Sequence, residues 1–499
     1  MDIFHNLATG FSIAVTGQNL FYCFLGALFG TLIGVLPGIG PLATIAMLLP
    51  ITFKLEPTGA LIMLAGIFYG AQYGGSTTAI LVNLPGEASS VATAIDGYQM
   101  ARQGRAGAAL ATAALASFFA GCVSTLVIAV AAPPLSRMAL LFGPAEFTAL
   151  MILGLVAAVV LASGSVVASL GMVMVGMMLG LVGTDVTTGE QRFTFGIRPI
   201  HDGIDFVVVA MGLFGIAEVI ANLADKQSRE LPAAKIDRLW PTGEEFRQAT
   251  PATIRGTILG TVLGVLPGGG ALVSSFASYS LEKRMARDPS RFGKGAIEGV
   301  AGPEAANNAG AQASFIPMLS LGIPPNAVMA LMIAAMTIHG ITPGPKFMTD
   351  QPKLFWAMVA SMWIGNLMLV ILNLPLVGIW VRLLKIPYAY LFPAILVFCS
   401  VGVYTVNYRV FDIAVMAGFG IFGYLLRRIG CEPAPMILGF LLGPMLEEQF
   451  RRTLLLCDGS LAVFAHRPLA AALLGVTAIL LVLMALPSLR RSRETVFKE

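Results

Sequence analysis

Long apolar segments follow one another along almost the whole chain, separated by short stretches rich in glycine, proline or charge. A membrane-spanning helix needs about 20 mostly apolar residues. Fourteen candidate segments are residues 19–36, 41–54, 58–82, 107–132, 138–162, 165–183, 205–223, 252–280, 311–338, 354–384, 388–406, 411–427, 433–446 and 468–487. Several are too short or too interrupted to cross a bilayer simply. We therefore expect an all-α polytopic membrane protein with about 11 to 12 transmembrane helices and additional re-entrant hairpins.

Charged stretches break this pattern at three places. Residues 225–250 contain ten charged side chains, and residues 282–294 contain five positive and two negative ones. The tail that begins at Arg490 is also basic. Because cytoplasmic loops carry an excess of Lys and Arg, we expect all three stretches on the cytoplasmic side. The segment 252–280 must then cross an even number of times, as a helix, a break and a second helix.

An internal repeat divides the chain into two related halves, which we expect to be inverted. Residues 30–40 (GTLIGVLPGIG) and 260–270 (GTVLGVLPGGG) are identical at eight of eleven positions. In each copy a proline removes a backbone donor and glycines permit a bend, which predicts a broken helix. The predicted helix-break residues are Pro37, Gly38, Gly40, Pro267, Gly268 and Gly270. We predict a first membrane repeat at 1–224, a charged cytoplasmic connecting loop at 225–250 and a second repeat with extra C-terminal helices at 251–499.

Polar residues gather inside apolar sequence at matching places after the two breaks, in residues 70–87 (GAQYGGSTTAILVNLPGE) and 302–326 (GPEAANNAGAQASFIPMLSLGIPPN). Neutral oxygens suit a hard monovalent cation such as Na⁺, whereas hydroxyls and free helix N–H groups suit a carboxylate. Duplicated halves with interrupted hydrophobic segments are typical of secondary transporters. The alternative, that these polar residues only bond one helix to another, stays open.

Carboxylates are few near these elements, and cationic side chains are absent. Glu87 and Glu304 are candidates for proton transfer because an ionisable residue at membrane depth is costly. We expect Asp96 instead to cap a helix or to lie in a solvated loop. No Lys or Arg occurs in residues 58–100 or 295–345. A bound anion would therefore be held by dipoles and hydroxyls, together with a bound cation.

Composition excludes several classes of protein. Hydrophobic residues make up 57% of the 499 and charged residues 12%, and the mean hydropathy is +0.82. Soluble domains carry about 25% charge, so a soluble enzyme is excluded. The net charge of +4 is too small to indicate a nucleic-acid partner. Five scattered cysteines and four histidines show no metal-binding spacing.

Two other functional classes remain as alternatives to a transporter. A channel would carry an ohmic current without saturation. An intramembrane enzyme would need a paired nucleophile and base, and we identify none in the sequence. There is also no Walker loop, so the chain by itself is no ATPase. We expect no enzymatic activity.

The quoted motifs resemble a known family. GVLPGIGP with STTAILVNLPGE in the first half, and GVLPGGGA with GPEAANNAGAQASFIPMLSLGIPPNAVMALMIAAMTIHGITPGP in the second, resemble the large permease subunit of tripartite tricarboxylate transporters, the TctA family. The resemblance covers nearly the whole chain, from about residue 15 to residue 485. Pro325 is a local departure, because we expect glycine after Gly322-Ile323-Pro324.

The resemblance implies a multi-pass protein of the bacterial inner membrane that imports organic acids such as citrate or other di- and tricarboxylates. It implies cation coupling with Na⁺ as the coupling ion, no cofactor, a small four-helix membrane subunit and a periplasmic solute-binding protein. It further implies an elevator motion of two hairpin tips. Elevator transporters are often dimers, and by this analogy alone a homodimer of the permease is an open alternative. The implied tip residues, which would bind substrate and cation, are Ser76, Thr77, Thr78, Asn83, Pro85 and Gly86 in one half and Asn307, Asn308, Gly322, Pro324 and Asn326 in the other.

Overall fold

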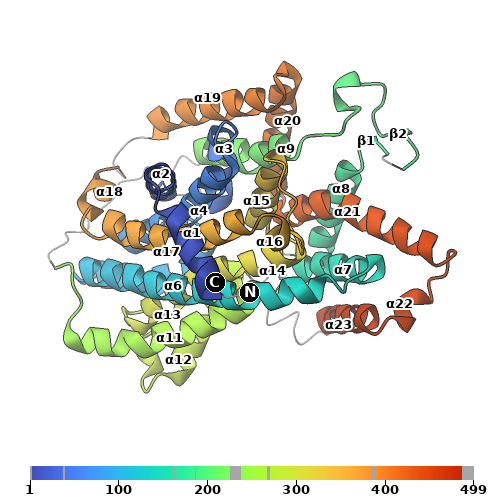
Figure 1. Ribbon diagram of the computed structural model, residues 1–499. Helices are drawn as coiled ribbons and strands as arrows, with labels where there is room; N and C mark the ends of the chain where they lie inside the picture. The colour runs from blue at the N-terminus through green and yellow to red at the C-terminus, as the bar shows by residue number, and fades with distance from the viewer. Residues whose placement is uncertain are drawn as a thin grey trace.

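Almost every element of the protein is helical. The computed structural model describes residues 3–36, 40–161, 165–185, 187–224, 238–266, 270–383 and 388–485. Within these ranges a single two-stranded antiparallel sheet is present, in which Gly183 pairs with Arg192. The described part of the chain therefore agrees with the predicted all-α class (Figure 1).

The elements before the connecting loop alternate long helices with short ones. They are α1 (Ile3–Ala14), α2 (Gly17–Gly34), α3 (Pro41–Thr52), α4 (Pro57–Val82), the 3-10 turn η1 (Ala88–Ser90), α5 (Val91–Arg102), α6 (Ala106–Ala139), α7 (Pro144–Leu161), α8 (Val166–Gly180), β1 (Gly183–Thr184), β2 (Gln191–Arg192), η2 (Arg198–Ile200), α9 (Phe206–Ala210), the π-helical segment η3 (Met211–Ile216) and α10 (Ala217–Ala224). Sequence periodicity did not indicate α1 or α5, because both are short for a membrane span.

The elements after the connecting loop are likewise long helices interspersed with short ones. They are α11 (Gly243–Val265), α12 (Gly270–Met285), η4 (Pro289–Arg291), α13 (Glu298–Ala313), α14 (Phe315–Leu321), α15 (Ala327–Ile338), α16 (Phe347–Asp350), α17 (Pro352–Asn373), α18 (Val377–Leu383), α19 (Tyr388–Asn407), α20 (Val410–Arg428), α21 (Ala434–Leu456), α22 (Val463–His466) and α23 (Pro468–Ala485).

Within the described ranges, five helices are long and apolar enough to cross a membrane, judged by length and composition. They are α2, α6, the continuous run Phe206–Ala224, α17 and α20. Six further apolar helices among the described residues have 10 to 17 residues. The protein is therefore a multi-pass membrane protein, whereas the larger number of full crossings stays a prediction.

Two differences from the sequence-based expectation concern helix ends. Residues 311–338, expected as one span, belong to three helices, because the chain turns at Gly322 with φ +73°. Residues 243–250, expected in the connecting loop, form the first turns of α11. A capping box explains this start, since the Thr242 hydroxyl accepts the Glu245 N–H and the Glu245 carboxylate accepts the Thr242 N–H.

The centre of the molecule consists of two helix pairs, α2 with α4 and α11 with α13, and helices α6 and α17 pack against them. Helices α11 and α12 pack against each other, and Arg255 on α11 forms an ion pair with Glu282 near the end of α12. That segment 252–280 crosses the membrane an even number of times stays a prediction.

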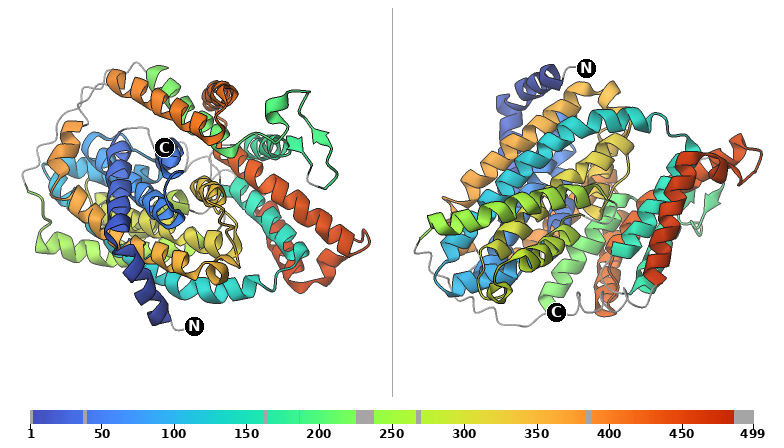
Figure 2. Two further views of the ribbon diagram at one scale, coloured as in Figure 1. Left: turned by 45° about the horizontal axis from the view of Figure 1, so that its top comes forward. Right: turned by 90° about the horizontal axis from the view of Figure 1, so that it is seen from below.

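A second group of helices lies beside this centre. Helix α8 packs against α21, and α7 packs against α23. Figure 1 and both views of Figure 2 show these teal and red helices together at one side of the bundle. Elements from the first half of the chain thus pack against the last helices of the second half.

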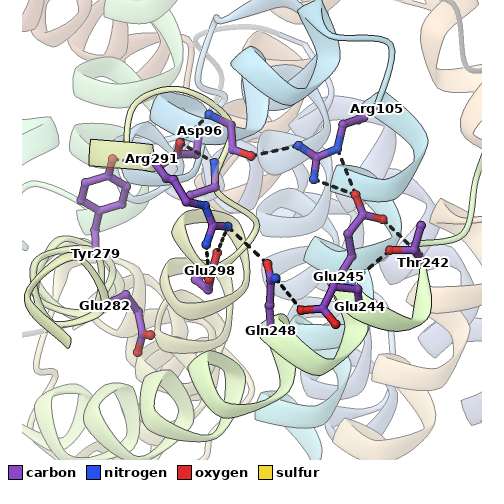
Figure 3. A network of polar contacts seen from close by, with 12 residues as sticks. Asp96, Arg105, Thr242, Glu244, Glu245, Gln248, Tyr279, Glu282, Arg291 and Glu298 are labelled. Carbon is purple, nitrogen blue, oxygen red and sulfur yellow. Dashed lines mark hydrogen bonds and ion pairs between the residues drawn. The ribbon is translucent and has the colours of Figure 1, made fainter. Parts of the chain in front are cut away.

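The two halves are also joined by a polar network near the charged stretches (Figure 3). Asp96 is fully buried and accepts the backbone N–H groups of Gly295 and Ala296 and the Tyr279 hydroxyl. The expectation of a solvated Asp96 is therefore wrong, because α5 turns this side chain toward the second half. Arg105 forms an ion pair with Glu245 at 2.6 Å.

Candidate functional site

Glycines allow the two central helix pairs to approach closely and in the same manner. A methyl group added at Gly30 on α2 would lie 2.3 Å from the carbonyl oxygen of Ile67 on α4. The equivalent methyl at Gly260 on α11 would lie 2.3 Å from the carbonyl oxygen of Ala306 on α13. Such close backbone contact requires small residues at the interface. The duplicated G-x-x-x-G pattern thus packs each half in a matching way.

Gly40 and Gly270, the described residues of the two predicted breaks, line one cavity of about 450 Å³. This volume lies in the range of small-molecule sites. Residues from both halves line it: Gly40, Pro41, Leu42, Phe68, Gln72, Pro85, Gly86, Glu87, Ala88, Ser89, Gly270, Ala271, Leu272, Ala311, Asn326, Ala327, Val328 and Ala434. The predicted site residues Pro85, Gly86 and Asn326 therefore come together here with the break residues Gly40 and Gly270. Pro37, Gly38, Pro267 and Gly268 lie outside the described residues.

Three helices begin at the wall of this cavity. The cavity is lined by the first residues of α3, by those of α12 and by those of α15. First-turn N–H groups have no partner within their own helix, and the helix dipole places positive partial charge there. Such ends bind anions. Among the described residues that line the cavity there is no Lys, Arg or His, so the helix ends are the groups there that carry positive partial charge.

Glu87 brings a negative charge to the same wall. Its Oε1 accepts a hydrogen bond of 2.9 Å from Nδ2 of the predicted residue Asn307 on α13. Gly75 and Gly86 let the chain return against α4 at this point, since a methyl at Gly86 would lie 2.4 Å from Gly75 Cα. Three buried oxygens nearby, Gln72 Oε1, Ser89 Oγ and Asn307 Oδ1, have no hydrogen-bond partner among the described residues.

The predicted hydroxyl residues lie in a different place. Ser76, Thr77 and Thr78 lie within α4 and not in an unwound tip. The Thr77 and Thr78 hydroxyls bond backward to carbonyls of their own helix. Ser76 Oγ lies 2.9 Å from Oε2 of Glu304 and takes part in a separate polar cluster.

That cluster surrounds Glu304 on α13. Its carboxylate also accepts Thr93 Oγ1 at 2.6 Å and Ser117 Oγ at 3.2 Å. The predicted residue Asn308 donates Nδ2 to Ser117 Oγ at 2.7 Å. Glu304 is thus fully buried and holds helices α4, α5, α6 and α13 together.

The remaining predicted residues lie away from both polar groups. Asn83 is exposed and ends α4 in the left-handed conformation, with φ +55°. Gly322 ends α14, and a methyl group there would lie 2.8 Å from the Pro343 carbonyl oxygen. Pro324 follows Ile323, which packs in a cluster with residues of α7, α8 and α21. Neither Gly322 nor Pro324 lines the cavity.

Sequence reasoning missed several polar residues. Gln72 and Ser89 line the large cavity, but a single glutamine or serine in an apolar helix carries no signal by itself. The Gly-Ala-Gln motif at 70–72 was the available clue. Among the described residues no group of three or more His, Cys, Asp or Glu could hold a metal ion.

Comparison with known proteins places this geometry in context. Residues 20–438 match the family described as the tripartite tricarboxylate transporter TctA family. The chain is 59% identical over 499 residues to an uncharacterized 52.8 kDa protein in the TAR-I ttuC' 3' region of Agrobacterium vitis, covering 100% of this chain and 99% of that protein. It is 58% identical over 236 residues to an uncharacterized protein in the TAR-II ttuC' 3' region of the same organism, covering 47% of this chain and 98% of that protein. No solved structure matches the chain.

Proposed function

Since this chain belongs to the tripartite tricarboxylate transporter TctA family, we propose that it is the membrane-embedded permease subunit of a binding-protein-dependent, cation-coupled importer of di- or tricarboxylates. Membership of this family implies a tripartite system with a small membrane subunit and a solute-binding protein. We place the system in the bacterial inner membrane, with the binding protein in the periplasm. Na⁺ is the proposed coupling ion.

The observation that carries the proposal is the convergence of three helix N-termini on one cavity. The helices α3, α12 and α15 come from both halves of the chain, and the first residues of each line the cavity. The N–H groups of a first helical turn have no partner within their own helix and can meet an anion there. A carboxylate can be held by such groups without a cationic side chain. The volume of about 450 Å³ is large enough for a small organic acid.

Glu87 supports cation coupling. A carboxylate in the wall repels an anionic solute unless a proton or a metal cation neutralises it. The solute and the cation therefore favour each other's binding, which is the physical basis of symport. The unpartnered oxygens of Gln72, Ser89 and Asn307 suit a hard cation such as Na⁺.

The matching helix pairs support a transporter of two inverted repeats with re-entrant hairpins. We propose that the broken elements around the cavity move as a unit in an elevator motion and expose the cavity alternately to the two sides. Free backbone groups at the breaks are tolerated because they line a cavity and not lipid.

Uptake into proteoliposomes tests the proposal. They contain this chain and its small membrane subunit, with the binding protein and a panel of di- and tricarboxylates outside. We expect saturable uptake that needs both the binding protein and an inward Na⁺ gradient. Uptake that persists without any Na⁺ or proton gradient would contradict symport, and an ohmic, non-saturating current would indicate a channel. If folded components took up none of the tested carboxylates, the carboxylate assignment would be contradicted.

A further inference from the structure

A second, smaller cavity lies against the carboxylate of Glu304. Its volume is about 20 Å³. One water-sized particle occupies about 10–15 Å³ by this measure. None of the described residues that line this small cavity also lines the cavity of about 450 Å³, which is the large cavity proposed to hold the solute and is called the solute cavity below. It has room for a single ion or water and not for an organic acid.

Hydroxyl groups, and no cationic side chains, surround Glu304. Ser76 Oγ and Ser117 Oγ lie 2.9 and 3.2 Å from Oε2, and both residues line the small cavity. In the part of the chain that the structure describes, no Lys, Arg or His lines it. A carboxylate buried this completely, at 0% exposure, is costly unless a positive charge or a proton accompanies it. The hydroxyls alone supply no such charge.

Two more oxygens at this cavity lack a partner. The Tyr73 hydroxyl and Asn373 Oδ1 are buried and have no hydrogen-bond partner in the described ranges. Asn373 donates Nδ2 to the Leu369 carbonyl at 2.9 Å, and this leaves its Oδ1 free. The two residues are only 4% and 7% exposed. Buried oxygens of this kind cost free energy unless a donor or a cation meets them.

We propose that Glu304, Ser76, Ser117, Tyr73 and Asn373 form a binding site for one dehydrated monovalent cation, and that Na⁺ fits best. One carboxylate balances one positive charge, and oxygen ligands suit hard cations. Mg²⁺ gives up its water reluctantly, and Ca²⁺ takes 6–8 oxygen ligands, more than this small cavity offers. The site is separate from the solute cavity and lies between α4, α6, α13 and α17.

The position of this site couples it to the solute cavity. Tyr73 lines the small cavity, and its neighbour Gln72 on α4 lines the large one. On α13, Glu304 lies one turn before Asn307, which bonds to Glu87 in the large cavity. A cation at Glu304 would fix both helices and thereby the wall that holds the solute. This step rests on the proposed function, whereas the cation site itself does not.

Binding of radioactive Na⁺ to the purified full-length chain in detergent tests the site. The assay contains no carboxylate and no partner protein, so a failure of uptake would leave its outcome unaffected. We expect saturable Na⁺ binding that choline does not displace, measured in Glu87→Gln as well as in the wild type so that a cation near Glu87 is separated from one at Glu304. In the Glu87→Gln background, Glu304→Gln should lower the affinity about tenfold or more, because the amide carries no charge. The matched control is Glu146→Gln, a buried carboxylate of α7 that pairs with Arg467; its Na⁺ affinity should stay within about twofold of wild type.

Two milder variants keep the test valid if Glu304→Gln fails to fold. Ser117→Ala and Asn373→Ala each remove one oxygen, and each should weaken Na⁺ binding about three- to tenfold while the protein stays monodisperse. Wild-type protein that binds no Na⁺ would overturn the proposal and would indicate a protonated Glu304. Unchanged Na⁺ affinity in folded Glu304→Gln would also overturn it.

Discussion

In the proposed function, Glu87 is the residue at which the charges of solute and cation meet. Replacing it by glutamine removes the repulsion of an anionic solute at this position, so solute binding should depend less on the cation. We expect the Kd of a carboxylate for the wild-type chain to fall about tenfold or more when Na⁺ is added, and that of Glu87→Gln to fall by a clearly smaller factor, because a cation at Glu304 still acts on the wall of the cavity. Calorimetric titration with and without Na⁺ measures both values.

The control for this prediction is Glu448→Gln on the exposed face of α21, where the carboxylate pairs with Arg452. It should keep the wild-type dependence on Na⁺. If Glu87→Gln kept that dependence too, Glu87 would not be the coupling group.

Asn326 shapes the N-terminus of α15. Its Oδ1 accepts the Met329 N–H at 3.0 Å, and its Nδ2 donates to Ser314 Oγ at 3.1 Å. Asn326→Ala should lower the stability by about 1 kcal/mol, the usual cost of a lost helix cap. Asn326→Ser, which can still cap, should recover most of this loss in thermal unfolding experiments. Equal losses in both variants would contradict the capping role.

At the scale of single residues the sequence indicated part of the site. Pro85, Gly86 and Asn326 follow visible break motifs, and the cavity contains them. Ser76 was singled out for its hydroxyl, but α4 continues through it and ends only at Val82, just before the break at Asn83-Leu84-Pro85-Gly86. Asn373 could not be found, because its role depends on α17 packing against a helix about 300 residues earlier in the chain.

Helix packing depends on backbone approach through glycine. Gly260→Ala places a methyl 2.3 Å from the Ala306 carbonyl oxygen and must push α11 away from α13. We expect a loss of about 1–3 kcal/mol, as in other overpacked interiors. Gly475→Ala on α23 is the matched control, because a methyl there meets nothing within 4 Å. It should be neutral or stabilising by about 0.5–1 kcal/mol. Equal melting temperatures of the two variants would contradict the close pairing.

Element boundaries were predictable where composition changes sharply. The apolar runs at 41–54 and 58–82 correspond to α3 and α4 within a few residues. Within the segment 311–338, the proline-bearing element at 322–326 indicated the break that follows α14, whereas the break at Ser314 lies within apolar sequence and was not indicated. The G-x-x-x-G motifs indicated close packing, and only the structure identified α4 and α13 as their partners.

The β-hairpin links the side group of helices through Asp185. The Thr187 backbone N–H, with the guanidinium groups of Arg451 and Arg192, outweighs the effect of burial and holds the pKa of Asp185 well below its usual range. Because this pKa is lower in the folded state, the stabilisation is present above about pH 4 and is lost as the pH falls. Thermal unfolding between pH 7 and pH 3 should show this loss in the wild type and less of it in Asp185→Asn. Asp458→Asn, an exposed carboxylate, should behave as the wild type does.

Across the whole molecule, Glu87 and Glu304 each face a cavity, and together they can balance two monovalent cations. Carrying one net negative charge inward against 100 mV costs about 2.3 kcal/mol. A dianion with two cations is electroneutral, so its accumulation should not respond to the membrane potential. A trianion retains one charge, and its accumulation should fall about 50-fold per 100 mV, inside negative.

Proteoliposomes with a potential set by a K⁺ gradient and an ionophore measure this dependence. Glu304→Gln removes one cation, so a dianion then carries one net negative charge inward. In this variant an inside-negative potential should lower the accumulation of a dianion as much as it lowers the accumulation of a trianion by the wild type. The comparison tests whether Glu304 accounts for one transported cation, because the loss of one cation changes the charge moved by one. A wild-type dianion flux that responds strongly to the potential would show that the number of coupled cations differs from the two that these cavities can hold.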